Sequence, residues 1–259
     1  MNNLSAMLWI ELRKAIRSGM PFGTALGSLF MPLGIAFLIY VSKNPAISQK
    51  LGLVSAKANL IAYSATDWPT YMGLSGQMIA AGGFFLFVMA VSWVFGREFS
   101  DGTLKDMLAV PVPRASILLA KFCVVGLWSV ALSVLMFVTS LLVGALIYLP
   151  GASQLVLVTS SLKMLVTAGM VIAVSLPFAF FASVGRGYLL PIGMAILTLM
   201  LANLVVVLGW GEIFPWAVPM LYAQGESVLP PLSYWSVLVT GLVGMLATYI
   251  WWQNADQNR

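Results

Sequence analysis

Long stretches without a charged residue dominate the chain, and each is long enough to form a helix that crosses a membrane. Such a helix needs about 20 apolar residues to span about 30 Å of hydrocarbon. The stretches lie between Arg17 and Lys43, Asp67 and Arg97, Lys121 and Lys163, Lys163 and Arg186, Arg186 and Glu212, and Glu226 and Asp256. The third is the longest, but Pro150-Gly151 divides it and leaves a remnant too short to cross. We therefore predict six spans, near residues 20–41, 70–95, 122–148, 164–184, 188–209 and 232–252.

Two segments outside the spans have patterns of their own. In residues 1–18, four aliphatic side chains recur every fourth residue while charged side chains occupy the other faces: Leu4, Leu8, Leu12 and Ile16. This pattern is typical of an amphipathic helix on the membrane surface, with a frayed extension of the first span as the alternative. Residues 210–231 contain a proline- and aromatic-rich stretch too short to span, which predicts an interfacial or re-entrant hairpin on the outer side. The expected fold class is all-α, a polytopic membrane protein with a single transmembrane domain over residues 1–259.

Composition excludes the soluble alternatives. Hydrophobic residues make up 61% of the chain and charged residues 8%, whereas a soluble domain carries about 25% charged residues. Histidine is absent, which excludes Ser-His-Asp hydrolases and His-ligated zinc enzymes. The chain also lacks a G-x-x-x-x-G-K-[ST] phosphate loop, and its acidic residues are too dispersed to hold a metal. We therefore expect no enzyme activity, no bound cofactor or metal and no nucleic-acid partner, with the lipid bilayer surrounding the spans.

The distribution of Lys and Arg predicts the orientation of the chain in the membrane. With a cytoplasmic N-terminus, nine of the 13 basic residues fall inside: Arg13, Lys14, Arg17, Arg97, Lys105, Arg114, Lys121, Arg186 and Arg259. The other four fall outside: Lys43, Lys50, Lys57 and Lys163. Because cytoplasmic segments carry the excess of positive charge, we expect both termini in the cytoplasm, although the three lysines of the first outer loop argue the other way.

A few polar and small residues inside the spans are candidates for function. The spans are almost free of charged residues, which argues against a proton- or sodium-coupled transporter. Gln77 and Asn203 are the strongest polar groups left, at a similar depth, and they predict either part of a substrate path or a bracing hydrogen bond. A stripe of small residues on the first span allows close helix approach, within the chain or to a second copy: Gly19, Gly23 and Gly27.

The predicted cytoplasmic loop, residues 97–121, is built to hold a short helix. Gly102 breaks the descending helix, and Thr103 with Asp106 has the spacing of a capping box. Two prolines then stop the new helix within about two turns: Pro111 and Pro113. This punctuation predicts a structured helix below the membrane, although an ordinary solvated loop is the alternative.

An apolar face on this short helix suggests that it docks into another protein. Leu104 and Leu108 are four residues apart, so they would share one face of the helix. A solvated loop would not need such paired leucines. We therefore expect the two leucines to act as anchors in a protein contact.

The loop motif is similar to that of a known family. Its residues resemble the coupling-helix signature of the type-2 class of ABC exporter permeases: Glu98, Phe99, Gly102, Thr103, Leu104 and Lys105, followed by Leu108, Pro111, Arg114 and Lys121. The order of parts is also similar, with a basic amphipathic N-terminal helix, six spans and a broken hairpin before the last span. Two further runs resemble the bacitracin-resistance and lantibiotic-immunity branch of that family: residues 183–191 and 214–216. The likeness covers nearly the whole chain.

The resemblance implies a permease subunit that dimerises, with a second copy or a homologous permease, and exports an amphipathic substrate. It implies a prokaryotic cytoplasmic membrane, and a separate ABC ATPase in two copies that holds ATP and magnesium. The docking residues would be Glu98, Gly102, Thr103, Leu104, Lys105, Leu108, Pro111 and Arg114. Glu98 and Arg114 would hold the two ends of the helix, and spans one, two and five would form the transport path at the subunit interface. A membrane assembly or scaffold factor, or an uncoupled channel, is the competing class.

Overall fold

The computed structural model describes residues 3–43, 67–225 and 229–254, and every regular element in these ranges is helical. Six of its helical stretches are long and apolar enough to cross a membrane, which confirms the predicted count. The spans are α2 (Met20–Lys43), α5 to α6 (Trp68–Met78, Ile79–Gly83 and Phe84–Ser100), α8 (Arg114–Leu146), α9 with α10 (Gln154–Ser175 and Phe178–Val184), α11 (Leu189–Val207) and α13 (Pro231–Asn254). Lys50, Lys57, Glu226 and Arg259 lie outside the described residues, as do the side chains of Lys43 and Leu108.

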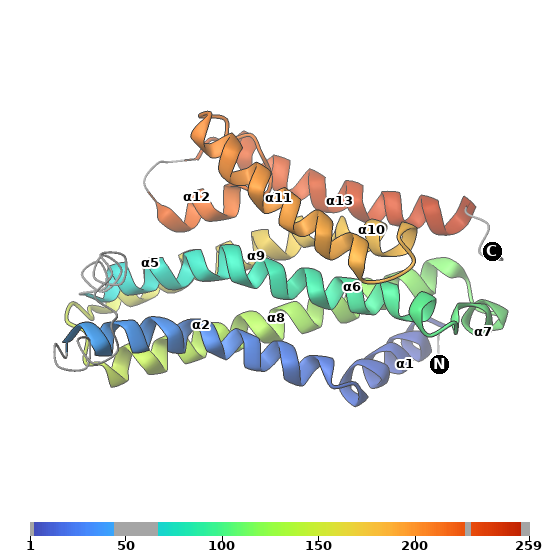
Figure 1. Ribbon diagram of the computed structural model, residues 1–259, viewed down its shortest axis with the longest axis horizontal. Helices are drawn as coiled ribbons and strands as arrows, with labels where there is room; N and C mark the ends of the chain where they lie inside the picture. The colour runs from blue at the N-terminus through green and yellow to red at the C-terminus, as the bar shows by residue number, and fades with distance from the viewer. Residues whose placement is uncertain (1–2, 44–66, 226–228, 255–259) are drawn as a thin grey trace.

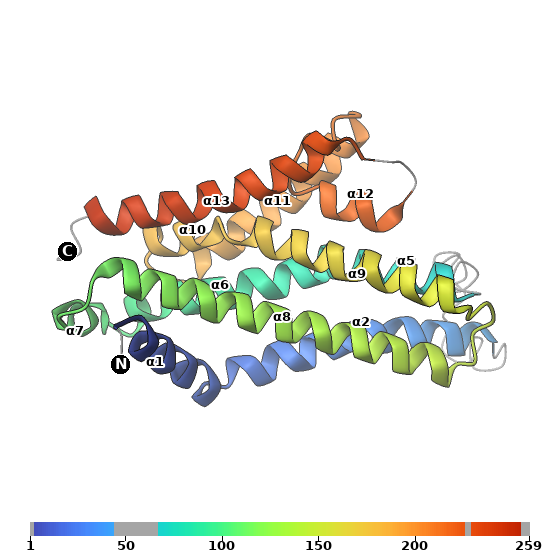
Figure 2. The same ribbon diagram turned by 180° about the vertical axis from the view of Figure 1, so that it is seen from behind.

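The spans lie side by side along the long axis of the molecule (Figures 1 and 2). Helix α1 (Asn3–Arg17), the end of α13 and the short helix α7 (Leu104–Ala109) gather at one end, which we call the α7 end. The opposite end carries the start of α5 and the short helix α12 (Val218–Gln224). The predicted topology needs this grouping, because it puts the N-terminal helix, the loop between spans two and three and the end of the last span on one side.

The second span lies at the centre of the bundle. In its most apolar stretch 67% of the residues are buried, compared with 22% in that of the first span and 17% in that of the fifth. The middle of this span, Ile79–Gly83, winds as a π-helix between α5 and α6. Short π-helical turns inside α-helices often mark functional positions. The second span therefore combines the deepest burial with a local irregularity, whereas few residues of α2 and α11 are buried.

Two span boundaries differ from the predicted ones. Helix α8 begins at Arg114 rather than near residue 122, and α9 begins at Gln154 rather than near residue 164. Ser153 caps α9, since its side chain accepts a hydrogen bond from the backbone N–H of Val156 at 3.2 Å. The charges used to delimit the spans do not stop a helix that continues beyond the hydrocarbon. The break at Pro150-Gly151 is where the sequence placed it, with Gly151 at φ +83°.

The segment before the last span folds back onto the bundle. Helix α12 packs against α5 and α9, with Val218 and Ala223 fully buried. The indole Nε1 of Trp216 donates a hydrogen bond to the carbonyl of Val174 at 2.9 Å. Gly225 ends the helix in the left-handed conformation, at φ +70°. How deeply this segment enters a membrane stays a prediction.

The N-terminal helix forms as predicted, but its buried face is a different one. Helix α1 packs on α8 through Met7, Glu11 and Ala15. Trp9 and Ile16 remain 61% and 69% exposed. Of the fourfold leucine and isoleucine repeat, Leu8 and Leu12 are half-buried and pack against the core, whereas Leu4 and Ile16 are exposed. Glu11, expected on a polar face, is only 4% exposed.

Candidate functional site

Buried charged residues occupy the base of the loop that carries α7. Lys121 on α8 is fully buried, and its Nζ lies 2.8 Å from a carboxylate oxygen of Glu98 on α6. The same Nζ donates to the carbonyl of Val94 at 2.7 Å. The two helices that enter and leave the loop are thus joined directly by an ion pair.

Helix α1 joins this ion pair and completes a charge cluster of four residues: Glu11, Lys14, Glu98 and Lys121. Lys121 Nζ lies 3.3 Å from Glu11, and Lys14 Nζ lies 2.7 Å from Glu11 and 3.2 Å from Glu98. Burial disfavours the charged form of Lys14, but attraction by Glu11 and Glu98 outweighs burial and raises the pKa of its amine. Two cations thus face two carboxylates, so the cluster neutralises itself and ties α1, α6 and α8 together.

The position of Glu98 differs from the one expected for a docking residue. Its side chain is buried inside the cluster and turned away from the surface that a partner protein could reach. The pairing of Glu98 with Lys121 could have been predicted from the sequence. A carboxylate at the end of a span needs a basic partner, and Lys121 lies at the start of the next span. The contribution of Glu11 could not be read from the sequence, since its helix packs through an unexpected face.

Helix α7 occupies the position predicted for the coupling helix. Gly102 precedes it in the left-handed conformation, at φ +69°, which glycine adopts without strain. A β-carbon there would meet open space, so backbone conformation and not crowding is the reason for glycine. Thr103 begins the helix, but its side chain makes no capping hydrogen bond, so the predicted capping box does not form.

The two predicted anchors do not form one exposed face. Leu104 is 7% exposed and packs into the main hydrophobic core of the chain, so it is not available to a partner in this structure. The side chain of Leu108 lies outside the described part. The surface of α7 and the residues after it consists of other side chains: Lys105, Asp106, Ala109, Val110 and Pro111.

Arg114 ties the loop to the last span. Its Nη1 donates to the carbonyl of Trp252, at the end of α13, at 2.6 Å. Trp252 is fully buried and donates from Nε1 to the hydroxyl of Ser183 at 2.9 Å. The ring of Phe99 contacts Trp252 with centroids 6.1 Å apart. Arg114 therefore joins the far end of the loop to the end of the last span.

The turn between α10 and α11 lies against α6 just before the loop. A β-carbon on Gly96 would lie 2.8 Å from the carbonyl oxygen of Gly187, so the two backbones are in direct contact. Arg186, in the same turn, has φ +50°. This turn belongs to the run at residues 183–191 that resembles the bacitracin-resistance branch.

The two intramembrane amides do not meet. The side chain of Asn203 donates to the carbonyl of Leu199 on its own helix at 2.8 Å, and Gln77 is half-buried. No hydrogen bond joins Gln77 and Asn203 among the described residues. Asn203 does line a cavity of about 200 Å³, and the amide that shares this cavity is Gln224 of α12.

The glycine stripe of the first span is only partly used within the chain. A β-carbon on Gly27 would lie 3.2 Å from Leu86 Cδ2, whereas one on Gly19 or Gly23 would meet nothing within 4 Å. Tighter glycine contacts occur on α13, where Gly241 and Gly244 lie against the backbone of the fourth span. Glycine spacing alone does not distinguish these glycines from the stripe on the first span, because it does not show which helix lies opposite.

Comparison with known proteins shows the class of the chain. The model of the ABC-2 family of transporter proteins matches residues 7–203. That match covers most of the chain, so the chain belongs to the ABC-2 transporter family. It is a membrane-spanning, non-catalytic permease subunit of an ABC transporter.

A curated relative supports a narrower placement. The chain is 26% identical over 174 residues to the bacitracin transport permease protein BCRB of Bacillus licheniformis. The match covers 66% of this chain and 84% of that protein. This likeness supports the bacitracin-resistance branch that the sequence motifs resembled.

Proposed function

We propose that this permease exports an amphipathic substrate, such as an antimicrobial peptide, a drug or a lipid-like molecule, across the cytoplasmic membrane of a prokaryote. Two copies of a separate ABC ATPase, which hold ATP and Mg²⁺, supply the energy to two permease subunits. The proposal draws on the family and on the printed name of the bacitracin transport permease relative. Both termini are cytoplasmic in this proposal, and the α7 end faces the ATPase.

The structural observation that carries the proposal is the way α7 is mounted. It sits between α6 and α8, which the ion pair between Glu98 and Lys121 holds together. Arg114 then links the start of α8 to the end of the last span. A push on α7 would therefore move three spans and α1 together, which is what coupling to a second subunit requires.

A cavity between three spans supports the expected transport path. Its volume is about 250 Å³. Its walls come from spans one, two and five: Met20, Met89, Ser92, Trp93, Tyr188 and Ile192. This is the set of spans expected at the path. A mostly apolar lining that includes the hydroxyl-bearing residues Ser92 and Tyr188 suits an amphipathic molecule. Asn203 remains a candidate for a second part of the path, and Gln77 is the weaker one because it does not line the cavity that Asn203 lines.

The proposed partner subunit would contact the exposed faces of α2 and α11. These helices expose large side chains such as Phe22, Phe30 and Met200, at 70%, 79% and 64%. Gly19 and Gly23 have room for close approach of another helix. A second copy or a homologous permease would cover this exposed apolar surface.

The test of ATPase docking uses the exposed end of α7. We expect Ala109→Asp/Val110→Asp to abolish capture of the ATPase in a pull-down, because it would bury unpaired carboxylates in the contact. Both positions are exposed, so size-exclusion behaviour in detergent should stay normal. Leu104→Asp is a poor test because Leu104 is part of the permease core, and its loss of function would reflect misfolding.

A matched control places the same charge at the opposite end. Tyr148 is 90% exposed there, so Tyr148→Asp should leave ATPase capture unchanged. Normal ATPase capture and normal export by Ala109→Asp/Val110→Asp would contradict docking through α7. That result would favour the assembly-factor or channel alternative.

A further inference from the structure

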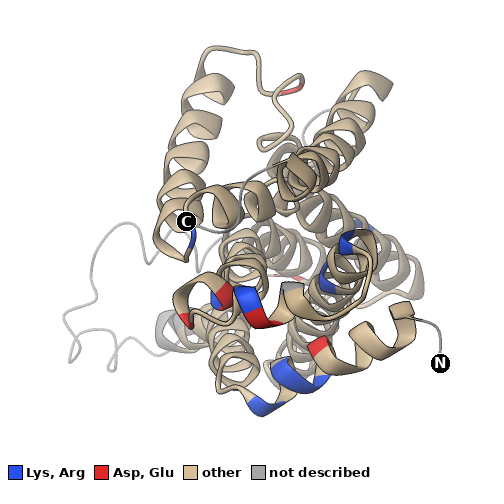
Figure 3. Ribbon diagram, turned by 90° about the vertical axis from the view of Figure 1, so that its right-hand side faces the viewer, with Lys and Arg blue, Asp and Glu red and all other residues tan. Residues whose placement is uncertain are grey.

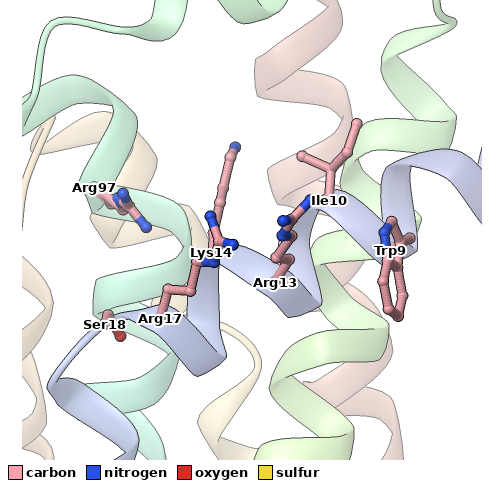
Figure 4. A pocket seen from close by; sticks show the side chains of 7 residues that line it. All are labelled: Trp9, Ile10, Arg13, Lys14, Arg17, Ser18 and Arg97. Carbon is pink, nitrogen blue, oxygen red and sulfur yellow. The ribbon is translucent and has the colours of Figure 1, made fainter.

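We propose that a basic pocket between α1 and α6 binds the phosphate-bearing headgroup of an anionic lipid in the cytoplasmic leaflet. The inference rests on the proposed orientation of the α7 end, but on neither export nor ATPase docking. The pocket has a volume of about 440 Å³ and is lined by Trp9, Ile10, Arg13, Lys14, Arg17, Ser18 and Arg97. Figure 4 shows these residues along one side of α1, with Arg97 facing them from α6.

Two of the cations in this pocket are not neutralised by the permease. Lys14 is paired within the charge cluster, and Arg97 Nε lies 3.1 Å from Asp101. Arg13 and Arg17 are exposed and make no ion pair with a described residue. The charge cluster is balanced and so is the Arg97 pair, so the pocket keeps two uncompensated positive charges. Figure 3, which looks onto this end, shows how the charged residues concentrate there.

The guanidinium of Arg97 has a further unsatisfied donor. Its Nη1 is buried and has no hydrogen-bond partner among the described residues. The group also lies over the ring of Trp93, 4.9 Å from the centroid, which holds it in place. Arginine forks match the oxygen geometry of phosphate, so the guanidinium of Arg97, which lines the pocket, suits an anion bound there.

The position of the pocket favours a lipid over a soluble phosphate. It lies where α1 ends and the first span begins, with Ser18 and Arg17 at the junction. Trp9 and Ile10 are 61% and 45% exposed, and Trp is typical of the headgroup level of a membrane. A free phosphate would use the arginines only, whereas a lipid would use both surfaces.

The test is lipid binding to the purified full chain, measured by native mass spectrometry in detergent. We expect phosphatidylglycerol to bind more tightly than phosphatidylcholine with the same acyl chains. Arg13→Gln/Arg17→Gln should weaken phosphatidylglycerol binding roughly 25-fold, since one basic residue near an anionic surface contributes about 1 kcal/mol, or about fivefold. The matched control Lys105→Gln/Lys163→Gln removes the same charge outside the pocket and should leave binding within about twofold.

Further variants and a second probe distinguish the lipid from a free anion. Trp9→Ala should weaken phosphatidylglycerol binding several-fold and leave any binding of inorganic phosphate unchanged. Equal phosphatidylglycerol binding by the wild type and Arg13→Gln/Arg17→Gln would overturn the proposal. So would binding of inorganic phosphate that depends on both arginines while phosphatidylglycerol binds no better than phosphatidylcholine. Because the ATPase is absent, neither result bears on docking through α7.

Discussion

The two ends of the bundle are held together by different interactions. At the α7 end, the charge cluster joins α1, α6 and α8 through ion pairs. At the opposite end, Trp68 and Tyr71 of α5 are buried against α8, and their rings meet edge to face. The hydroxyl of Tyr71 donates to the carbonyl of Ser140 at 3.0 Å, and Gly144 leaves room for both rings. One end is thus stabilised mainly by buried ion pairs, and the other mainly by aromatic packing with a buried hydrogen bond.

This difference fits the proposed coupling role of the α7 end. Ion pairs fix the relative orientation of helices, because the charged atoms lose much of their attraction when they separate in a buried place. Such contacts suit the end that would receive a movement from a partner. Aromatic packing is less directional and needs only a close fit, which suits an end that anchors the bundle.

The largest expected effect is at the charge cluster. Lys121→Met removes the fully buried cation that both Glu98 and Glu11 face. It leaves buried carboxylates without their main partner, which typically costs about 3–5 kcal/mol. Thermal unfolding in detergent should show a large loss of stability for this variant.

Two comparisons make this prediction specific. Lys105→Met removes an exposed cation of α7 and should change stability by less than about 0.5 kcal/mol. Adding Glu98→Gln to Lys121→Met should recover part of the loss, because the unpaired charge is then removed. If Lys121→Met unfolds like the wild type, the ion pairs do not hold the α7 end together.

A smaller effect is expected from packing at the opposite end. In Gly144→Ala, the new β-carbon would lie 2.7 Å from the Trp68 ring and 3.1 Å from the Tyr71 ring, so both buried rings must shift. Such overpacking costs about 1–3 kcal/mol. Thermal unfolding and the near-ultraviolet circular dichroism of the aromatic rings would report it.

The same helix offers the control for this substitution. Gly126 also lies on α8, and a β-carbon there meets nothing within 4 Å. Gly126→Ala should therefore be neutral or slightly stabilising, because alanine favours the helix. Equal stability of the two variants would mean that the aromatic contact adapts freely, and the contrast between the two ends would be lost.

Much of the fold could be predicted because the membrane constrains it so strongly. Charges and Pro150-Gly151 were enough to locate six spans, since no water is available to a broken helix inside the hydrocarbon. The ends of α8 and α9 could not be placed this way, because outside the membrane a helix continues until its own sequence stops it. The close contact of Gly96 with Gly187 needs the three-dimensional arrangement, since glycine spacing does not reveal which helix is opposite.

The candidate site was predicted in position but not in detail. Gly102 and Pro111 correctly delimited the short helix, because backbone conformation is a local property. The burial of Glu98 and Leu104 could not be predicted, because it depends on how the other helices pack around the loop. The loop motif thus predicts where α7 lies in the sequence, and only the packing shows which of its side chains face outward.

The smallest expected effect on stability comes from the N-caps of two helices, α5 at one end of the bundle and α7 at the other. Asp67 caps α5, since its carboxylate accepts a hydrogen bond from the backbone N–H of Thr70 at 3.0 Å. Thr103 precedes α7 without any capping hydrogen bond from its side chain. Asp67→Ala should therefore cost about 1 kcal/mol of stability, whereas Thr103→Ala should cost almost nothing.

The effect of pH provides an independent check on Asp67. Hydrogen bonds from Thr70 lower the pKa of the Asp67 carboxyl. A group with a lowered pKa stabilises the folded state above its ordinary pKa of 3.8, and that contribution is lost as the pH falls through the lowered value. Thermal unfolding of Asp67→Asn should lose this acid dependence while keeping most of the cap, because an amide oxygen still accepts from the backbone. Equal losses of stability in Asp67→Ala and Thr103→Ala would show that the capping bond at the start of α5 contributes nothing measurable.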